Sequence, residues 1–298
     1  MRGVETRGAD RRNKSTEMNR NFLTQILAKK RQVVGRLQHE FFARGFRERA
    51  LEIRSNATPH RLLRALEAEL PRLKIIAEFK RRSPSAGILR DDLSVADVAR
   101  RYERGGACAI SVLTDDEYFG GSLEDLSAAR SSAKLPVLRK DFIIDPIQIY
   151  EAAMAGADAV LLIVAALDDA LLGRLREAAE DELGLDALVE VHTSDELRRA
   201  LDAGAKIIGV NNRDLQTLEV SPSTSARLIA EAPQDSVMIS ESGLRDPEQL
   251  RCLRALGFRG FLIGEALMLS TDPEKALRDL IVTAGDPQAI NGRIRTRK

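Results

Sequence analysis

The sequence predicts a closed (β/α)8 barrel preceded by a helical extension, and three observations support this prediction. Eight short apolar runs rich in strand-forming residues recur at intervals of 20 to 34 residues. Most intervals contain an amphipathic stretch with helical spacing, such as 95–102 or 171–178. Glycines at positions 106, 156, 204 and 257 stand between such a stretch and the next run, where helix C-caps are expected. The predicted strands are 75–79, 109–113, 136–138, 159–164, 187–191, 207–210, 237–239 and 260–263.

Strands and helices that alternate in this way form either a closed barrel or an open, doubly wound sheet. Two features favour the barrel. The predicted unit, residues 71–284 with a last helix at 273–282, has the length of roughly 200 residues or more that is usual for TIM barrels. No GxGxxG pattern follows the first strand, as a dinucleotide-binding open sheet would require.

The segments outside the barrel are predicted from their own patterns. Helices are expected at 22–37 and 60–70, within an extension of residues 18–70 that caps or flanks the barrel. Residues 1–17 are polar and without hydrophobic period, which predicts a disordered tail. The segment 285–298 begins with a Gly-Asp-Pro breaker and is basic at its end, which predicts a C-terminal tail.

The composition excludes several classes of partner. Lys plus Arg number 46 and Asp plus Glu 45, and this net charge of +1 is too balanced for a dedicated nucleic-acid or anionic-membrane binder. Two distant cysteines and three histidines make neither a disulfide framework nor a metal cluster credible. The sequence has no run long enough to span a membrane and no signal-peptide core. We therefore expect a cytoplasmic protein that acts on a small molecule or another protein.

Polar residues gather at the C-terminal ends of five predicted strands, where barrels carry their active sites. The period of two along a strand places Glu78 and Lys80 on one face and turns Glu190 inward. Charged residues can also form ion pairs that merely plug the top of a core. Five clusters on one rim favour a functional site. They are Glu78-Phe79-Lys80, Arg139-Lys140-Asp141, Glu190, Asn211-Asn212-Arg213-Asp214 and Ser240-Glu241-Ser242-Gly243.

The loops after the last two predicted strands contain the residues of a phosphate site, because barrels often bind phosphate there through backbone N–H groups. Gly243 and Gly264 would let the backbone approach an anion, whereas Glu265 would have to turn its side chain away. Ordinary turn glycines are the alternative. The loop 83–87 after the first strand either adds hydroxyl contacts from serines or is a simple turn.

The sequence resembles the indole-3-glycerol phosphate synthase family from about residue 22 to residue 282. Each matching motif is weak alone, but seven occur in order at their proper barrel positions. They are 76–85 (IAEFKRRSPS), 113–115 (LTD) with 118–121 (YFGG), 138–142 (LRKDF), 189–192 (VEVH), 209–215 (GVNNRDL), 240–243 (SESG) and 263–268 (IGEALM).

The family reaction closes the indole ring of 1-(2-carboxyphenylamino)-1-deoxyribulose 5-phosphate and releases CO2 and water without a metal or organic cofactor. By resemblance, Lys140 is the general acid that protonates the substrate carbonyl, and we expect burial to lower its pKa toward neutrality. Glu190 is its acid or base partner in the dehydration, and Lys80 pairs with the carboxylate that leaves as CO2. Glu78 and Asn211 position these groups and the substrate hydroxyls. Which lysine delivers which proton stays open.

The resemblance also implies a set of binding residues. Arg213 supports the carboxylate end of the substrate, and Glu241 holds lysine or hydroxyl groups. Ala86 and Glu265 depart from the family pattern, since relatives carry a basic and a small hydroxyl residue there, so position 265 offers only backbone donors. His192 shares the parity of Glu190, but we expect a structural role for it. The phosphate residues are Ser83, Ser242, Gly243 and Gly264, and the residues walling the aromatic ring are Phe119, Phe142 and Leu215.

The resemblance implies a phosphorylated small-molecule substrate and no nucleic acid or membrane partner. We expect a monomer that can associate with other tryptophan-pathway enzymes. Two alternatives remain open. Phosphoribosylanthranilate isomerase, another phosphate-binding barrel, is disfavoured because it uses a Cys and an Asp, whereas Cys108 precedes a strand start. An RNA-binding protein that uses the arginine-rich tails is disfavoured because the tails lack interleaved aromatic residues.

Overall fold

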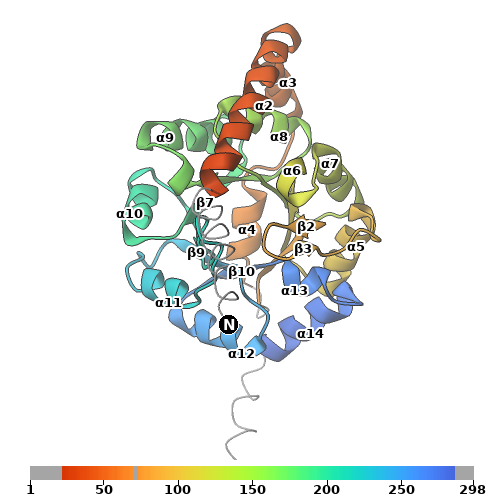
Figure 1. The fold of residues 1–298 in the computed structure, drawn as a ribbon, viewed down its shortest axis with the longest axis vertical. Helices are drawn as coiled ribbons and strands as arrows, with labels where there is room; N and C mark the ends of the chain where they lie inside the picture. The colour runs from red at the N-terminus through yellow and green to blue at the C-terminus, as the bar shows by residue number, and fades with distance from the viewer. Residues whose placement is uncertain (1–21, 70–72, 286–298) are drawn as a thin grey trace, which may run out of the picture.

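In the computed structural model, which describes residues 22–69 and 73–285 apart from the side chains of 40–44, the chain forms the predicted closed barrel (Figure 1). Eight parallel strands follow one another around the ring in the order β1-β10-β9-β8-β7-β6-β5-β4. Strand β1 closes the ring, with Ala77 opposite Ile263 of β10 on one side and Ile110 of β4 on the other. The strands are β1 (Ile75–Phe79), β4 (Ala109–Leu113), β5 (Val137–Lys140), β6 (Ala159–Ile163), β7 (Asp186–Val191), β8 (Ile207–Asn211), β9 (Val237–Glu241) and β10 (Gly260–Ile263).

Three of these strands, β1, β4 and β10, have the predicted bounds. The prediction was wrong at the C-terminal ends of β5, β8 and β9, which continue one or two residues beyond the apolar run. The reason is that the backbone ladder of hydrogen bonds does not depend on side-chain polarity. Lys140, Asn211 and Glu241 are therefore the last residues of strands and not loop residues.

Helices surround the strands as an outer ring (Figure 1). Most begin at a side-chain cap of the usual kind, as where Ser94 accepts a hydrogen bond from the backbone N–H of Asp97. The four glycines at the predicted junctions, 106, 156, 204 and 257, have positive φ, as C-caps require. The helices are α5 (Val95–Gly105), α6 (Asp116–Phe119), α7 (Leu123–Ser132), α8 (Pro146–Met154), α9 (Asp169–Glu177), α10 (Ser194–Asp202), α11 (Ser223–Ile229), α12 (Pro247–Leu256), α13 (Glu265–Met268) and α14 (Pro273–Gly285), with the short turns η1 (Val164–Ala166) and η2 (Ala178–Glu182).

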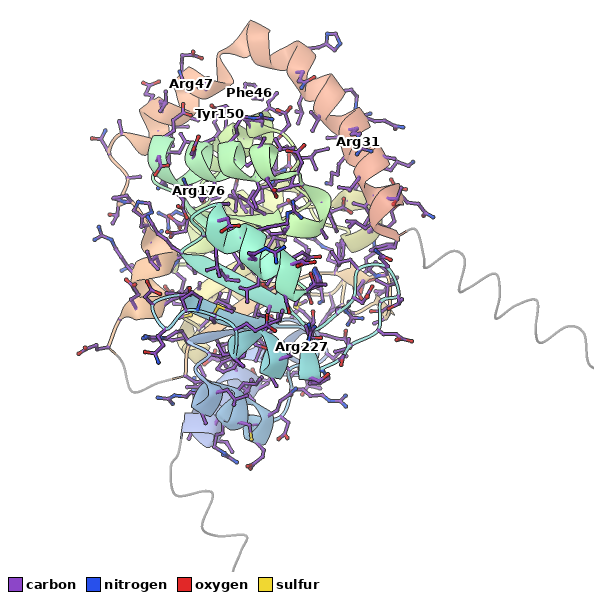
Figure 2. All side chains as sticks on the ribbon, turned by 90° about the vertical axis from the view of Figure 1, so that its left-hand side faces the viewer. Arg31, Phe46, Arg47, Tyr150, Arg176 and Arg227 are labelled. Atoms are coloured by element: carbon purple, nitrogen blue, oxygen red, sulfur yellow. The ribbon has the colours of Figure 1, made fainter. Side chains whose placement is uncertain are left out.

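The N-terminal extension contains three described helices, α2 (Phe22–Arg44), α3 (Phe46–Arg54) and α4 (Arg61–Glu67). Two predictions need correction, because α2 runs past residue 37 and α3 was not predicted. Helix α3 buries only Phe46 and Ala50, so its sequence carries little hydrophobic pattern. It packs on α8, where Figure 2 shows Phe46, Arg47 and Tyr150 gathered. The tails predicted at 1–17 and 285–298 lie outside the described residues, except that Gly285 ends α14.

Helices α2 and α4 close the two ends of the barrel interior. One hydrophobic cluster contains inward-facing strand residues such as Leu138 and Leu188 together with Phe22 and Ile26 of α2 and Leu62 and Leu66 of α4. The backbone N–H groups of Leu62 and Leu63 donate to Asp186 at the start of β7, which places α4 at the N-terminal end of the strands. Helix α2 therefore lies at the opposite end, where the strands terminate. A second cluster fills the space between the strands and the outer helices.

A small antiparallel hairpin, which the sequence did not predict, follows β1. It consists of β2 (Arg82–Ser83) and β3 (Gly87–Ile88), and it orders the serine-containing loop at the barrel mouth. None of the described helices combines the length and the apolarity needed to cross a membrane.

Candidate active site

The polar strand ends converge at the barrel mouth, as predicted, and line two adjoining cavities. Both cavities share Glu78, Lys80, Lys140, Arg213 and Ser242, so they form one continuous site. The apolar cavity is further lined by Phe22, Phe119, Phe142, Leu161, Ile163 and Leu215. The polar cavity is further lined by Glu241, Gly243, Arg245, Gly264, Glu265 and Ala266.

A buried ammonium stands at the centre of the site. The Nζ atom of Lys140, at the end of β5, lies 3.1 Å from Oε2 of Glu190 on β7 and 3.5 Å from Oε2 of Glu241 on β9. Both glutamates are 1% exposed, so water does not screen these contacts. The parallel strands place the three groups together because each is the last or next-to-last residue of its strand.

The carboxylates set the charge state of Lys140. Burial lowers its pKa, but Glu190, Glu241 and Glu78 together outweigh burial and raise the pKa above its ordinary value. The expectation that desolvation moves this pKa toward neutrality was therefore wrong, because the lysine is buried among acidic groups and not among apolar ones. These carboxylates therefore favour the ammonium form of Lys140.

The pKa values of the two carboxylates beside Lys140 are shifted in opposite directions. Burial raises the pKa of Glu190, but Lys140, His192 and the Asn211 side chain outweigh it, so the pKa is lowered. Burial, reinforced by Glu190 and Glu78, raises the pKa of Glu241 to about 8 although Lys140 opposes this shift. One lysine cannot neutralise both glutamates, so Glu190 is the ionised partner and Glu241 takes up a proton first.

A second ion pair lies on β1 at the same rim. The Nζ atom of Lys80 is 2.7 Å from Oε1 of Glu78, which confirms that the two side chains share a face. Glycines make room for the carboxylates. An added Cβ at Gly264 would lie 2.3 Å from Oε1 of Glu78, and one at Gly209 would lie 2.0 Å from Oε1 of Glu241.

The loop after β8 joins the two cavities. Asn211 accepts a hydrogen bond of 2.9 Å from the backbone N–H of Arg213, and Arg213 donates to the carbonyl of Leu218 at 2.9 Å. The guanidinium also lies 3.9 Å from Oε2 of Glu265. The Glu265 side chain is thus directed at a cavity-lining arginine. We expected it to turn away, and the ion pair with Arg213 explains the difference.

Aromatic side chains wall the apolar cavity. The rings of Phe119 and Phe142 are 6.5 Å apart and tilted by 32°, and Leu215 lies on the same cavity. Phe22 of α2 is a wall residue that sequence reasoning missed, and it packs edge-on against Tyr118 at 5.3 Å. Its only signal was an apolar side chain in the first turn of a helix predicted to cap the barrel.

The predicted phosphate residues do not all meet. Ser242 and Gly243, with φ of 67° and 73°, lie with Gly264 on the polar cavity. Ser83 instead lines the apolar cavity, and its Oγ accepts a hydrogen bond from the backbone of Ala86 at 3.1 Å. Arg245 was missed. It is exposed on the polar cavity and has no hydrogen-bond or ion-pair partner among the described residues.

Within the described residues, no group of three or more His, Cys, Asp or Glu side chains is arranged to hold a metal ion. The chemistry available at the mouth is that of ammonium, carboxylate, amide and guanidinium groups. These groups can donate and accept protons and bind anions.

The fold and the site together define the class of protein. A barrel whose mouth joins a carboxylate-held ammonium to an apolar cavity and a glycine-lined polar cavity is an acid–base enzyme for a small substrate with an aromatic and an anionic end. More narrowly, the model of the indole-3-glycerol phosphate synthase family matches residues 23–280, and the chain belongs to that family.

Individual relatives agree. The chain is 47% identical over 251 residues to the indole-3-glycerol phosphate synthase of Chloroherpeton thalassium, covering 84% of this chain and 95% of the relative. It is 44% identical over 263 residues to that of Carboxydothermus hydrogenoformans, covering 87% and 99%. Among solved structures, the thiamine phosphate pyrophosphorylase of Pyrococcus furiosus matches with a TM-score of 0.54 at 18% identity, covering 71% of this chain and 95% of that chain. The latter similarity concerns the fold alone.

Proposed function

We propose that the protein is a carboxy-lyase that closes the indole ring of 1-(2-carboxyphenylamino)-1-deoxyribulose 5-phosphate, in tryptophan biosynthesis. Family membership supports the reaction, and one observation carries the residue roles. Lys140, held as an ammonium by its ionised partner Glu190 and lying 3.5 Å from Glu241, stands where the apolar and polar cavities meet. A substrate with its carboxyphenyl ring in one cavity and its phosphate in the other has its reacting carbonyl beside this lysine.

Binding uses the two cavities separately. The ring packs between Phe119, Phe142 and Leu215, and Phe22 covers it from α2. The ring carboxylate faces Lys80 and Arg213, because both lie at the junction of the cavities. The phosphate is held by the backbone N–H groups at Gly243 and Gly264 with the Ser242 hydroxyl. Glu265 contributes its backbone only. Ser83 contributes through its position beside the ring and not through the polar cavity.

Ring closure is the first chemical step. The aromatic carbon that bears the carboxylate attacks the substrate carbonyl, a C–C bond forms, and Lys140 gives its proton to the carbonyl oxygen. Bond formation then drives loss of CO2, since the electrons of the breaking C–C bond restore the aromatic system. Loss of the new hydroxyl as water, with removal of one proton, completes the indole. Glu190 accepts this proton. Glu78 and Asn211 position the catalytic side chains and the substrate hydroxyls. Lys80 is the second ammonium available, and the variants below separate its role from that of Lys140.

The proposal extends to a monomer in the cytoplasm. The two cysteines of the protein, Cys108 and Cys252, are free thiols in the structure, which suits a reducing compartment. Size-exclusion chromatography with light scattering tests the monomer, and a dimer mass would contradict it.

The decisive experiment is direct turnover. Purified protein is mixed with the carboxyphenylamino-deoxyribulose phosphate, and indole fluorescence is followed with time. The chain contains no tryptophan, so the product is seen against a low background. We expect a steady rise that is lost in Lys140→Met. No rise at micromolar enzyme would contradict the proposal. Isomerisation of phosphoribosylanthranilate by the same preparation would support the alternative barrel enzyme.

A further inference from the structure

Behind the site, two buried polar atoms face each other, and neither has a hydrogen-bond partner among the described residues. One is Oε1 of Glu190 and the other is Nε2 of His192, and they lie 3.6 Å apart. Unpaired buried polar atoms are rare and costly. The separation is slightly longer than a hydrogen bond, so a shift of a few tenths of an ångström would let one proton bridge the two atoms.

The other ring nitrogen of His192 already has a hydrogen-bond partner. Its Nδ1 lies 3.2 Å from Oε2 of Glu196 in α10, and the same oxygen accepts a 2.7 Å hydrogen bond from the His192 backbone N–H. A carboxylate only accepts, so Nδ1 carries a hydrogen. The proton on Nε2 is then the variable one, and it faces Glu190. The carboxylate of Glu196 thus fixes both the ring orientation and the tautomer.

Charged and polar groups from several neighbouring elements act on this pair. Lys140 on β5 lies against the opposite oxygen of Glu190, and Asn211 on β8 adds to the lowering of the Glu190 pKa. Burial lowers the pKa of His192, but Glu196, Glu190 and Glu241 raise it above its ordinary value. Arg227 on α11, labelled in Figure 2, donates to the His192 backbone carbonyl at 3.5 Å.

His192 lines neither cavity, so it acts on the site through the side chains that it faces, and its Nε2 faces Glu190. We propose that His192 is a positioning residue that Glu196 orients so that its Nε2 shares one proton with Oε1 of Glu190 during turnover. The two forms are imidazolium with carboxylate and imidazole with carboxylic acid. They differ only in the place of that proton, and no other reactant is needed. The inference rests on the proposed function, in which Glu190 handles the proton of the dehydration.

The first test is the pH dependence of turnover. His192→Phe removes the imidazole and keeps a flat ring. Without the nearby positive charge the pKa of Glu190 rises, so the limb of the kcat profile that reports Glu190 moves to higher pH by about half a unit to one unit. We expect kcat near pH 7 to fall roughly tenfold and KM to stay within about twofold.

Two further variants separate the contribution of the imidazole N–H donor from that of its charge. His192→Gln retains an N–H donor that cannot titrate, so part of kcat returns while the shifted limb stays. Glu196→Gln leaves the histidine but weakens its charge, which gives a smaller shift in the same direction and none in the His192→Phe background. The control is His60→Asn. His60 also pairs with a carboxylate, Asp186 at 3.2 Å, but at the other end of the barrel, and its φ of 52° suits asparagine.

A second readout does not depend on activity. The chain has three histidines, so the imidazole signal of His192 is assigned in NMR spectra by comparison with His192→Gln. We expect its pKa to lie above 6.5 and to fall in Glu190→Gln. A kcat profile of His192→Phe that superposes on that of the unaltered enzyme would overturn the inference, as would a His192 pKa that is insensitive to Glu190. An unaltered protein without turnover would instead contradict the proposed function.

Discussion

The carboxylate of Glu78 occupies the space that a side chain at Gly264 would fill, since an added Cβ would lie 2.3 Å from its Oε1. Glu78 begins the charged rim on β1, and Gly264 follows the neighbouring strand β10. The same relationship recurs two strands away, where Gly209 leaves room for Glu241. Glycines beside buried carboxylates are therefore part of the active-site geometry, in addition to any contact of Gly264 with phosphate.

Gly264→Ala should displace Glu78 and disturb its ion pair with Lys80. We expect kcat/KM to fall by roughly tenfold to a hundredfold, because an interaction of about 1–3 kcal/mol is lost or strained. The matched control is Gly173→Ala in α9, where an added Cβ meets nothing within 4 Å. The control should keep full activity and gain about 0.5–1 kcal/mol in the free energy of unfolding. Equal activities of the two variants would contradict the proposed role of the space at Gly264.

Lys140→Met should lower kcat by roughly 10² to 10⁴ or more, because the general acid and its positive charge are both lost. The fold should be retained, as judged by circular dichroism. Lys80→Met should act mainly on the decarboxylation, which release of labelled CO2 measures. Near-normal turnover of Lys140→Met would remove this lysine from the mechanism.

Stability should depend on pH through Glu241. Its pKa rises from 4.5 to about 8 on folding, chiefly because of burial, so the folded protein binds this proton more tightly than the unfolded chain. The contribution is fully present below about pH 4.5 and is lost as the pH rises to about 8. Glu241→Gln removes that loss. In urea melts, we measure the free energy of unfolding of the variant minus that of the unaltered protein. We expect this difference to be more positive at pH 8.5 than at pH 5. Glu177→Gln, an exposed change in α9, should show no such trend.

The attachment of helix α2 to the barrel should depend on one buried lysine. Lys30 lies 2.6 Å from Asp141 and 2.9 Å from Asp115, and its side chain is 9% exposed. Lys30→Met leaves buried Asp115 without its cation and leaves Asp141 with Arg139 as its remaining cation, and it should lower the free energy of unfolding by about 3–5 kcal/mol. KM should rise as well, because Asp141 and Phe22 line the apolar cavity.

The neighbouring lysine is the control for this prediction. Lys29 pairs with Glu117 at 3.6 Å, but both side chains are 54% exposed. Lys29→Met should therefore change stability by less than about 1 kcal/mol. A similar loss in both variants, measured by denaturant unfolding, would show that helix composition and not the buried network holds α2.

Arg245→Ala should weaken phosphate binding. Its guanidinium, which has no partner among the described residues, adds one charge-assisted contact on the polar cavity, so KM should rise about threefold to tenfold with kcat unchanged. The constant for competitive inhibition by inorganic phosphate should rise in parallel. Arg259→Ala serves as control, because Arg259 immediately precedes β10 and therefore lies at the opposite end of the barrel. An unchanged phosphate constant would remove Arg245 from the site.

Local pattern was enough for most of the architecture. Parallel strands buried on both faces must be apolar, so the eight runs were visible, and their polar ends marked the rim that holds Lys140, Glu190 and Glu241. The pattern was insufficient where burial is slight or the partner is distant. Helix α3 and the β2–β3 hairpin bury few residues. Phe22 lies far along the chain from the aromatic residues that it joins at the site. Arg245 lies only two residues beyond Gly243, but outside the 240–243 motif that marked this part of the site.

The sequence by itself determined the barrel, the order of its strands and the residue types at its mouth, because these follow from hydrophobic period and from motifs that are local. Only the tertiary structure decided the charge state of that mouth. Whether a buried lysine loses or keeps its proton depends on which carboxylates face it across the barrel, and here Glu190 and Glu241 are 50 and 101 residues away along the chain. His192 differs in that both carboxylates beside its ring, Glu190 and Glu196, are close in sequence, but only the tertiary structure decided which ring nitrogen faces which carboxylate.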